Sequence, residues 1–176
     1  STLFPYTTLF RSGRRHHHTP ILFNSSHTKM AGCHVNAGWA LGVLGRFEEA
    51  LTEYREALDI YRKLPNVDQD RGDCLLRVGS VLYRDGRFEG ARESYCKALE
   101  VYRRLKGAEG RQVVCLVNIG TAQVMLDRYA EALASWGEAL EVYRRVGDGQ
   151  EDQGDCLEEG MRELRDAMRS HEEDAR

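Results

Sequence analysis

The residues of this chain that could most readily bind a metal or form disulfides are its cysteines. Four of the five, Cys33, Cys74, Cys115 and Cys156, follow one another at intervals of 41 residues. Copies of one position in neighbouring helical repeats lie at least about 8–10 Å apart, beyond the ~7 Å Cα separation that a disulfide spans without backbone movement. The chain also lacks a CxxC pair. We therefore expect small residues buried at helix contacts, with no disulfide and no metal site.

Histidine is concentrated in the first part of the chain. His16, His17 and His18 form a tract without an acidic or cysteine neighbour, so we interpret them as solvated side chains and not as metal ligands. The sequence has no Ser–His–Asp arrangement, no phosphate-binding glycine loop and no carboxylate pair of fixed spacing. We therefore predict that the protein is not an enzyme and needs no cofactor.

A repeated stretch organises the chain. Residues 45–50 read GRFEEA, residues 86–91 read GRFEGA and residues 127–132 read DRYAEA, so the period is again 41 residues. A fixed period of this size is typical of stacked helical units. Apolar residues around each copy recur at three- and four-residue spacing, which predicts a helix on either side of the repeated turn.

The repeat predicts the boundaries of the domain. We expect a repeat domain over 28–170, followed by a frayed tail at 171–176. Its parts are three helical hairpins and a polar-faced end helix that closes the array, at residues 28–68, 69–109, 110–150 and 151–170.

Two segments precede the repeats. Residues 2–12 read TLFPYTTLFRS, which is the translation of a sequencing adapter, so we exclude residues 1–12 from the fold as an artefact. Residues 13–27 show no period and are predicted to be disordered. The artefact also implies that the true N-terminus is missing or displaced.

The net charge of −3 hides an uneven distribution. Residues 1–27 carry three arginines and no acid, which leaves 22 basic against 28 acidic residues in the remainder. Because phosphate binding needs a basic face, the acidic body argues against nucleic acid as a ligand. No apolar run approaches the ~20 residues of a membrane-spanning helix, and free cysteines suit a reducing compartment. We expect a cytoplasmic protein with neither a nucleic-acid nor a membrane partner.

The residues at the repeated positions resemble the tetratricopeptide repeat signature, in which small residues let two antiparallel helices approach closely. The first repeat carries this pattern as Gly38, Leu41, Gly45, Ala50, Tyr54 and Ala57, and the other two follow it with the same spacing. The usual period is about 34 residues, and the longer one resembles kinesin light chain and Pins-like repeats. The resemblance implies an all-α fold, a right-handed α-solenoid of three such hairpins plus a C-terminal capping helix.

The resemblance also implies a concave groove lined by the first helix of each hairpin. In the family, asparagines in this groove hydrogen-bond the backbone of an extended peptide, for which an amide has both a donor and an acceptor. We place the candidate groove residues two positions before and one position after the inward glycine of a hairpin, and one turn beyond it. They are Asn36, Trp39, Arg77, Ser80, Tyr83, Asn118, Thr121 and, in the end helix, Glu159.

These residues predict a protein–protein interaction scaffold that binds a peptide or a partner helix in the concave groove. Mixed apolar and amide groups suit a ligand with apolar anchors and a backbone clamp. Two alternatives stay open from the sequence. The chain could be a sensor or regulatory segment of a larger signalling protein, or a self-associating array.

Overall fold

A computed structural model describes residues 19–147 and 151–174 of the chain. This described part contains seven α-helices and no strand. The helices are α1 (Thr19–Val43), α2 (Phe47–Tyr61), α3 (Asp68–Arg84), α4 (Phe88–Arg103), α5 (Glu109–Val124), α6 (Tyr129–Val146) and α7 (Glu151–Asp174). The predicted all-α repeat architecture is confirmed.

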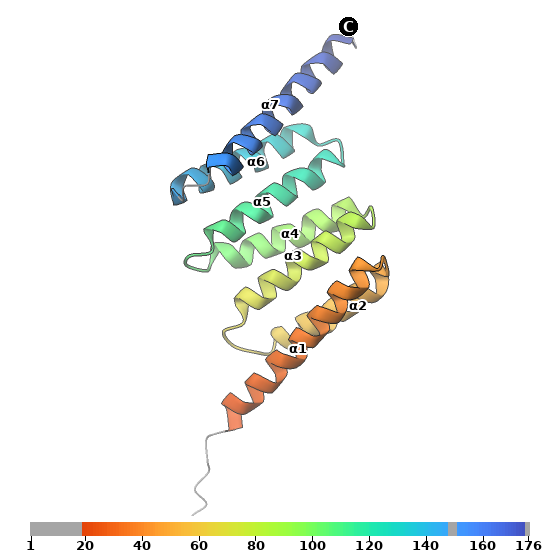
Figure 1. Ribbon diagram of the computed structural model, residues 1–176, viewed down its shortest axis with the longest axis vertical. Helices are drawn as coiled ribbons and strands as arrows, with labels where there is room; N and C mark the ends of the chain where they lie inside the picture. Colours follow the sequence, from red (N-terminus) through yellow and green to blue (C-terminus); the bar gives the residue numbers. More distant parts are fainter. Residues whose placement is uncertain (1–18, 148–150, 175–176) are drawn as a thin grey trace, which may run out of the picture.

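The helices form a stack with α1 at one end and α7 at the other (Figure 1). Three antiparallel hairpins, α1–α2, α3–α4 and α5–α6, pack on one another through α2 against α3 and α4 against α5, and α7 packs on α6. Each hairpin therefore contacts chiefly its immediate neighbours, as is usual in solenoids.

The repeated turn ends the first helix of each hairpin in the same way. Gly45, Gly86 and Asp127 adopt left-handed backbone with φ of 75°, 77° and 58°. The next residue then donates its N–H five positions back, as Arg87 does to the Leu82 carbonyl at 2.8 Å. This is the Schellman termination of a helix, and an aspartate tolerates the left-handed conformation better than most residues.

An aromatic ring seated on a glycine holds the two helices of each hairpin together. A methyl group added at Gly79 would lie 2.5 Å from Cε1 of Tyr95, and one at Gly38 would lie 3.0 Å from the Tyr54 ring. Gly120 meets Trp136 in the same way, and the Trp136 indole also donates to the Val117 carbonyl at 3.1 Å. Only glycine leaves room for these rings.

Ion pairs between successive turns repeat with the same period. Arg87 pairs with Glu48 of the preceding hairpin at 2.7 Å, and Arg128 pairs with Glu89 at 3.1 Å. Glu48 is mostly exposed and the other three side chains are about half exposed, so each pair contributes only about 0–1 kcal/mol.

Both end helices are longer than predicted. Helix α1 begins at Thr19 and not near 28, so residues 19–27 of the segment predicted to be disordered are helical. Helix α7 continues to Asp174, where the sequence predicted a tail from 171. Periodicity missed both extensions because their helices continue without an apolar repeat. The adapter-like segment 1–12, the histidine tract and residues 148–150 and 175–176 lie outside the described residues.

The cysteines differ from the prediction at the two ends of the array. Cys74 and Cys115 are fully buried, as predicted, whereas Cys33 and Cys156 are exposed. The Cys74 thiol lies 3.7 Å from the Tyr54 carbonyl of the preceding hairpin. At Cys74 this position is therefore covered by the preceding hairpin. No such hairpin covers Cys33 among the described residues, and α7 leaves Cys156 uncovered.

Replacing Gly79 by alanine should destabilise the fold. The Tyr95 ring is buried and cannot yield to the added methyl, so overpacking costs about 1–3 kcal/mol and offsets the ~1 kcal/mol that alanine gains over glycine in a helix. The urea midpoint of Gly79→Ala should therefore fall. The matched control is Gly32→Ala, because a methyl there meets nothing within 4 Å. Equal midpoints for the two variants would contradict the ring-on-glycine contact.

Candidate functional site

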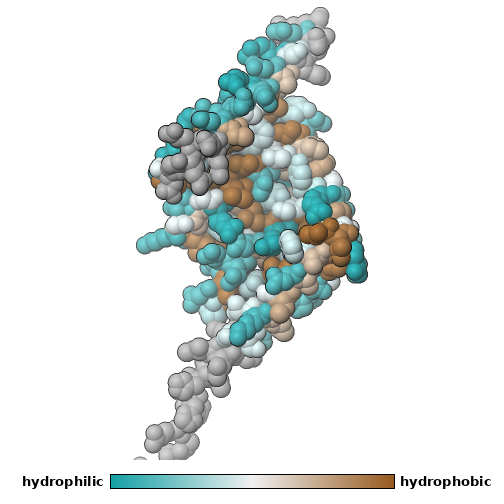
Figure 2. All heavy atoms as spheres, viewed as in Figure 1, coloured by the Kyte–Doolittle hydropathy of each residue, from teal (hydrophilic) through white to brown (hydrophobic). Residues whose placement is uncertain are grey.

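Three cavities lie along the first helices of the stack. The α1–α3 cavity has a volume of about 230 Å³, the α3–α5 cavity about 180 Å³ and the α5–α7 cavity about 440 Å³. Adjacent cavities share wall residues: Arg77 and Ser80 line the first two, and Val114 and Asn118 line the last two. The cavities therefore form one continuous groove across α1, α3, α5 and α7. Apolar and polar side chains are interspersed over the stack in Figure 2.

Four of the eight candidate residues line this groove, namely Trp39, Arg77, Ser80 and Asn118. Trp39 is 57% exposed at the α1 end. No hydrogen bond from the Asn118 side chain to another described residue is present, so its amide offers both a donor and an acceptor. The structure thus brings one aromatic, one cationic, one hydroxyl and one amide side chain into a single groove.

The other four candidates, Asn36, Tyr83, Thr121 and Glu159, do not line the three cavities. Asn36 is exposed on α1. The Tyr83 ring packs edge-to-face on Phe88, with the ring centroids 5.3 Å apart, and so belongs to the α3–α4 contact.

The hydroxyl groups predicted for the groove are already engaged as donors. Thr121 donates to the Val117 carbonyl at 2.9 Å, and Ser80 donates to the Leu76 carbonyl at 3.0 Å. Ser80 also accepts from the Tyr95 hydroxyl at 3.4 Å, so it presents only its remaining acceptor lone pair to a ligand.

Glu159 lies away from the groove because α7 presents a different face from α3 and α5. Residue 159 matches Arg77 and Asn118 in the repeat, yet Gly154, Leu157 and Gly160 are the α7 residues that face the cavity with Cys156. Glu159 instead pairs with Arg162 at 3.1 Å on the exposed side of the helix.

The residue that replaces the inward glycine explains this change of face. Met161 stands where the three hairpins have their ring-bearing glycine, and it is buried. Its terminal methyl reaches Gly137 of α6, so α7 is oriented by this contact.

The middle of the groove is positively charged although the body of the protein is acidic. Arg77 and Arg111 line the α3–α5 cavity, and Arg84 lines the α1–α3 cavity. The single acid among them, Asp73, accepts from the Tyr102 hydroxyl at 2.6 Å and pairs with Arg111 at 3.2 Å. The groove middle therefore favours a ligand with acidic or strongly accepting groups.

Sequence reasoning missed Asp73, Arg111 and Val114 as groove residues. The signal was available, because Arg111 and Val114 precede Asn118 by seven and four residues, the spacing of one helix face. The prediction began two residues before each inward glycine and did not consider the earlier turns of the first helices.

The comparisons with known proteins agree with this geometry. Family models described as tetratricopeptide repeat match residues 31–66 and 70–145. The chain belongs to the tetratricopeptide repeat family. No curated protein sequence matches it.

Solved structures with the same fold share little sequence with this tetratricopeptide repeat chain. The N-terminal domain of stress-induced protein-1 from C. elegans is 18% identical with a TM-score of 0.64, over 80% of this chain and 98% of that one. The apo form of RapI is 17% identical with a TM-score of 0.69, over 81% and 51%. The TPR2AB domain of yeast Sti1 is 17% identical with a TM-score of 0.66, over 84% and 50%. At such identities the likeness establishes the fold alone.

Within the part of the chain that the structure describes, no group of three or more His, Cys, Asp or Glu side chains is placed to hold a metal ion. No described helix is long and apolar enough to cross a membrane.

The buried cysteines should resist alkylation in the folded protein. Burial raises the pKa of the Cys74 and Cys115 thiols to about 12, so at pH 8 almost none of the reactive thiolate is present. Iodoacetamide should label Cys33 and Cys156 first, as read by peptide mass spectrometry, and reach Cys74 and Cys115 only after unfolding in guanidinium. Native labelling of Cys74 as fast as Cys33 would contradict the burial of the inner repeats.

Proposed function

We propose that the protein is a protein–protein interaction scaffold that binds an extended peptide or a partner helix in the groove of the three cavities. The observation that carries the proposal is the continuity of these cavities across α1, α3, α5 and α7. A groove of this length gives several side chains of one ligand a place at the same time.

The groups in the groove match the needs of a peptide. Asn118 offers a donor and an acceptor to a peptide unit, and Ser80 adds an acceptor. Trp39 supplies exposed apolar area at one end. Arg77 is placed for a carbonyl or a carboxylate of the ligand. Asn36 lies one turn before Trp39 on α1, and we propose that it extends the clamp past the end of the cavities.

The comparisons support proteins as the class of partner. The yeast Sti1 structure is a complex of its TPR2AB domain with pHSP90, so the fold accommodates a protein ligand in at least one relative. The present groove has the acid Asp73 between its arginines, with the amide of Asn118 beside them. The proposal therefore concerns a peptide ligand in general and assigns no chaperone partner.

Removing the two asparagine amides should weaken binding and leave the fold intact. Peptides selected on the wild-type protein from a displayed random library serve as the ligands. Each lost hydrogen bond costs about 1–3 kcal/mol, so Asn36→Ala combined with Asn118→Ala should raise the dissociation constant well beyond tenfold in a titration. Helical circular dichroism should stay unchanged.

The matched control for this titration is Lys97→Ala, which removes an exposed side chain on α4, in the second layer of helices. It should leave the affinity unchanged. If the asparagine variant binds as tightly as Lys97→Ala, the groove does not bind the selected peptides and the proposal fails.

A further inference from the structure

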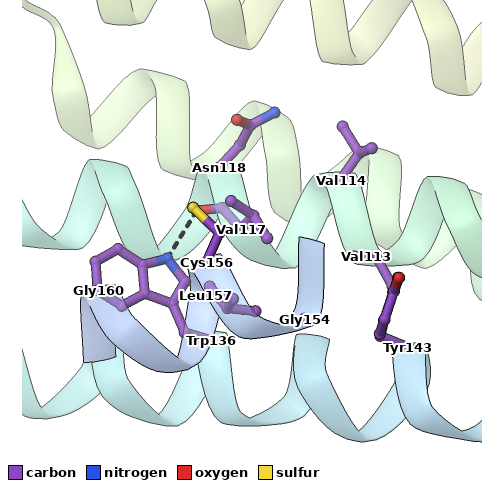
Figure 3. A pocket seen from close by; sticks show the side chains of 10 residues that line it. All are labelled: Val113, Val114, Val117, Asn118, Trp136, Tyr143, Gly154, Cys156, Leu157 and Gly160. Atoms are coloured by element: carbon purple, nitrogen blue, oxygen red, sulfur yellow. Dashed lines mark hydrogen bonds between the residues drawn. The ribbon is translucent and has the colours of Figure 1, made fainter. Parts of the chain in front are cut away.

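The largest of these three cavities lies at the end of the groove, between α5, α6 and α7. Figure 3 shows its lining residues around one hollow. They are Val113, Val114, Val117, Asn118, Trp136, Tyr143, Gly154, Cys156, Leu157 and Gly160. A volume of about 440 Å³ falls within the range of small-molecule and side-chain pockets, roughly 300–1,000 Å³.

The cavity is open beside Gly160, one of the positions at which α7 departs from the repeat. Gly160 occupies the position of Val78 in α3 and Ile119 in α5, at intervals of 41 residues. Ile119 is buried and belongs to the core, and Val78 packs against that core. A methyl group added at Gly160 meets nothing within 4 Å. Gly160 itself lines the cavity, so the side chain that this position lacks leaves the cavity open.

The described residues that line this α5–α7 cavity are mostly apolar and uncharged. None of its ten lining residues is charged, whereas the adjoining α3–α5 cavity contains Asp73, Arg77 and Arg111. The Trp136 indole N–H is already bonded to the Val117 carbonyl (Figure 3). An occupant must therefore be largely apolar, because a charged group would lose its hydration without gaining a partner.

Asn118 connects the cavity to the rest of the groove. It lines both the α5–α7 and the α3–α5 cavity, and no hydrogen bond with another described residue engages its side-chain amide. A peptide unit that hydrogen-bonds Asn118 would thus place one neighbouring side chain toward the apolar cavity and another toward the charged one.

We infer that the α5–α7 cavity is the anchor pocket of the groove and takes one bulky uncharged side chain of the bound partner, such as phenylalanine or leucine. This inference rests on the proposed function of the groove. Charge complementarity assigns the occupants: polar or acidic ligand groups face Arg77 and Arg111, and the apolar side chain enters beside Gly160. Gly160 is then the residue that determines this preference, because any larger side chain there occupies the pocket itself.

The test uses two capped amino acids as probes that are added to the 176-residue chain. N-acetyl-phenylalaninamide carries a bulky side chain between two amide groups, and N-acetyl-glycinamide carries the amides alone. Binding is followed by NMR through the indole N–H signal of Trp136. We expect the phenylalanine probe to bind with an affinity of about millimolar, as suits its size, and the glycine probe to leave the signal unchanged.

Gly160→Ile restores the side chain of the inner repeats and should abolish binding of the phenylalanine probe. The same variant should be at least as stable as the wild type, because the space is open and glycine is a poor helix former. Gly32→Ile is the matched control, since that helical glycine also has nothing within 4 Å of an added methyl, and it should bind as the wild type does. Should Gly160→Ile fail to fold, Gly160→Val provides the same comparison with a smaller change.

Three results would overturn the inference. The first is that the phenylalanine probe leaves the Trp136 signal unperturbed, and the second is that Gly160→Ile binds this probe as the wild type does. The third is that toluene binds while neither capped amide does, which would make the cavity a site for a small apolar molecule. None of these results alters the effect of the asparagine variants on selected peptides. Failure of the anchor pocket is therefore distinguishable from failure of the groove.

Discussion

The contact of an aromatic ring with a bare backbone decides how the rest of this structure is built. Tyr54, Tyr95 and Trp136 each lie on a glycine of the partner helix, at a separation that no side chain would permit. The close approach buries the alanines that follow each turn, such as Ala50 and Ala91, and fixes the angle between the two helices. Everything outside the hairpins, including the groove, inherits its geometry from this contact.

Most of the fold follows from the sequence because its determinants are local and repeated. The turn residues, the inward glycines and the aromatic residues that pack on them recur at one period, so a single observation predicts three hairpins. The structure departs from prediction where the environment is not repeated. The exposure of Cys33 and Cys156 was not predictable from the repeat, because a repeat position carries no information about which helices cover it.

The candidate site was predictable only in part, since it depends on contacts between helices. Periodicity places Trp39, Arg77, Ser80 and Asn118 on the face that lines the three cavities. It also assigns Glu159 to that face, but Glu159 does not line the cavity. Met161 and Gly160 break the repeat pattern in α7, so this helix presents other residues to the cavity. The partner of Arg111 is Asp73 on the preceding first helix, a pairing that no single-helix argument reveals.

Each hairpin touches chiefly its neighbours. Small rotations at each junction between hairpins would therefore change the curvature of the whole array. A ligand that lies along the groove would contact all of these units at once and would link hairpins that otherwise do not touch. Its binding would then restrict the rotations between hairpins. Because bending the array costs energy, partners that match its unbound curvature would be favoured.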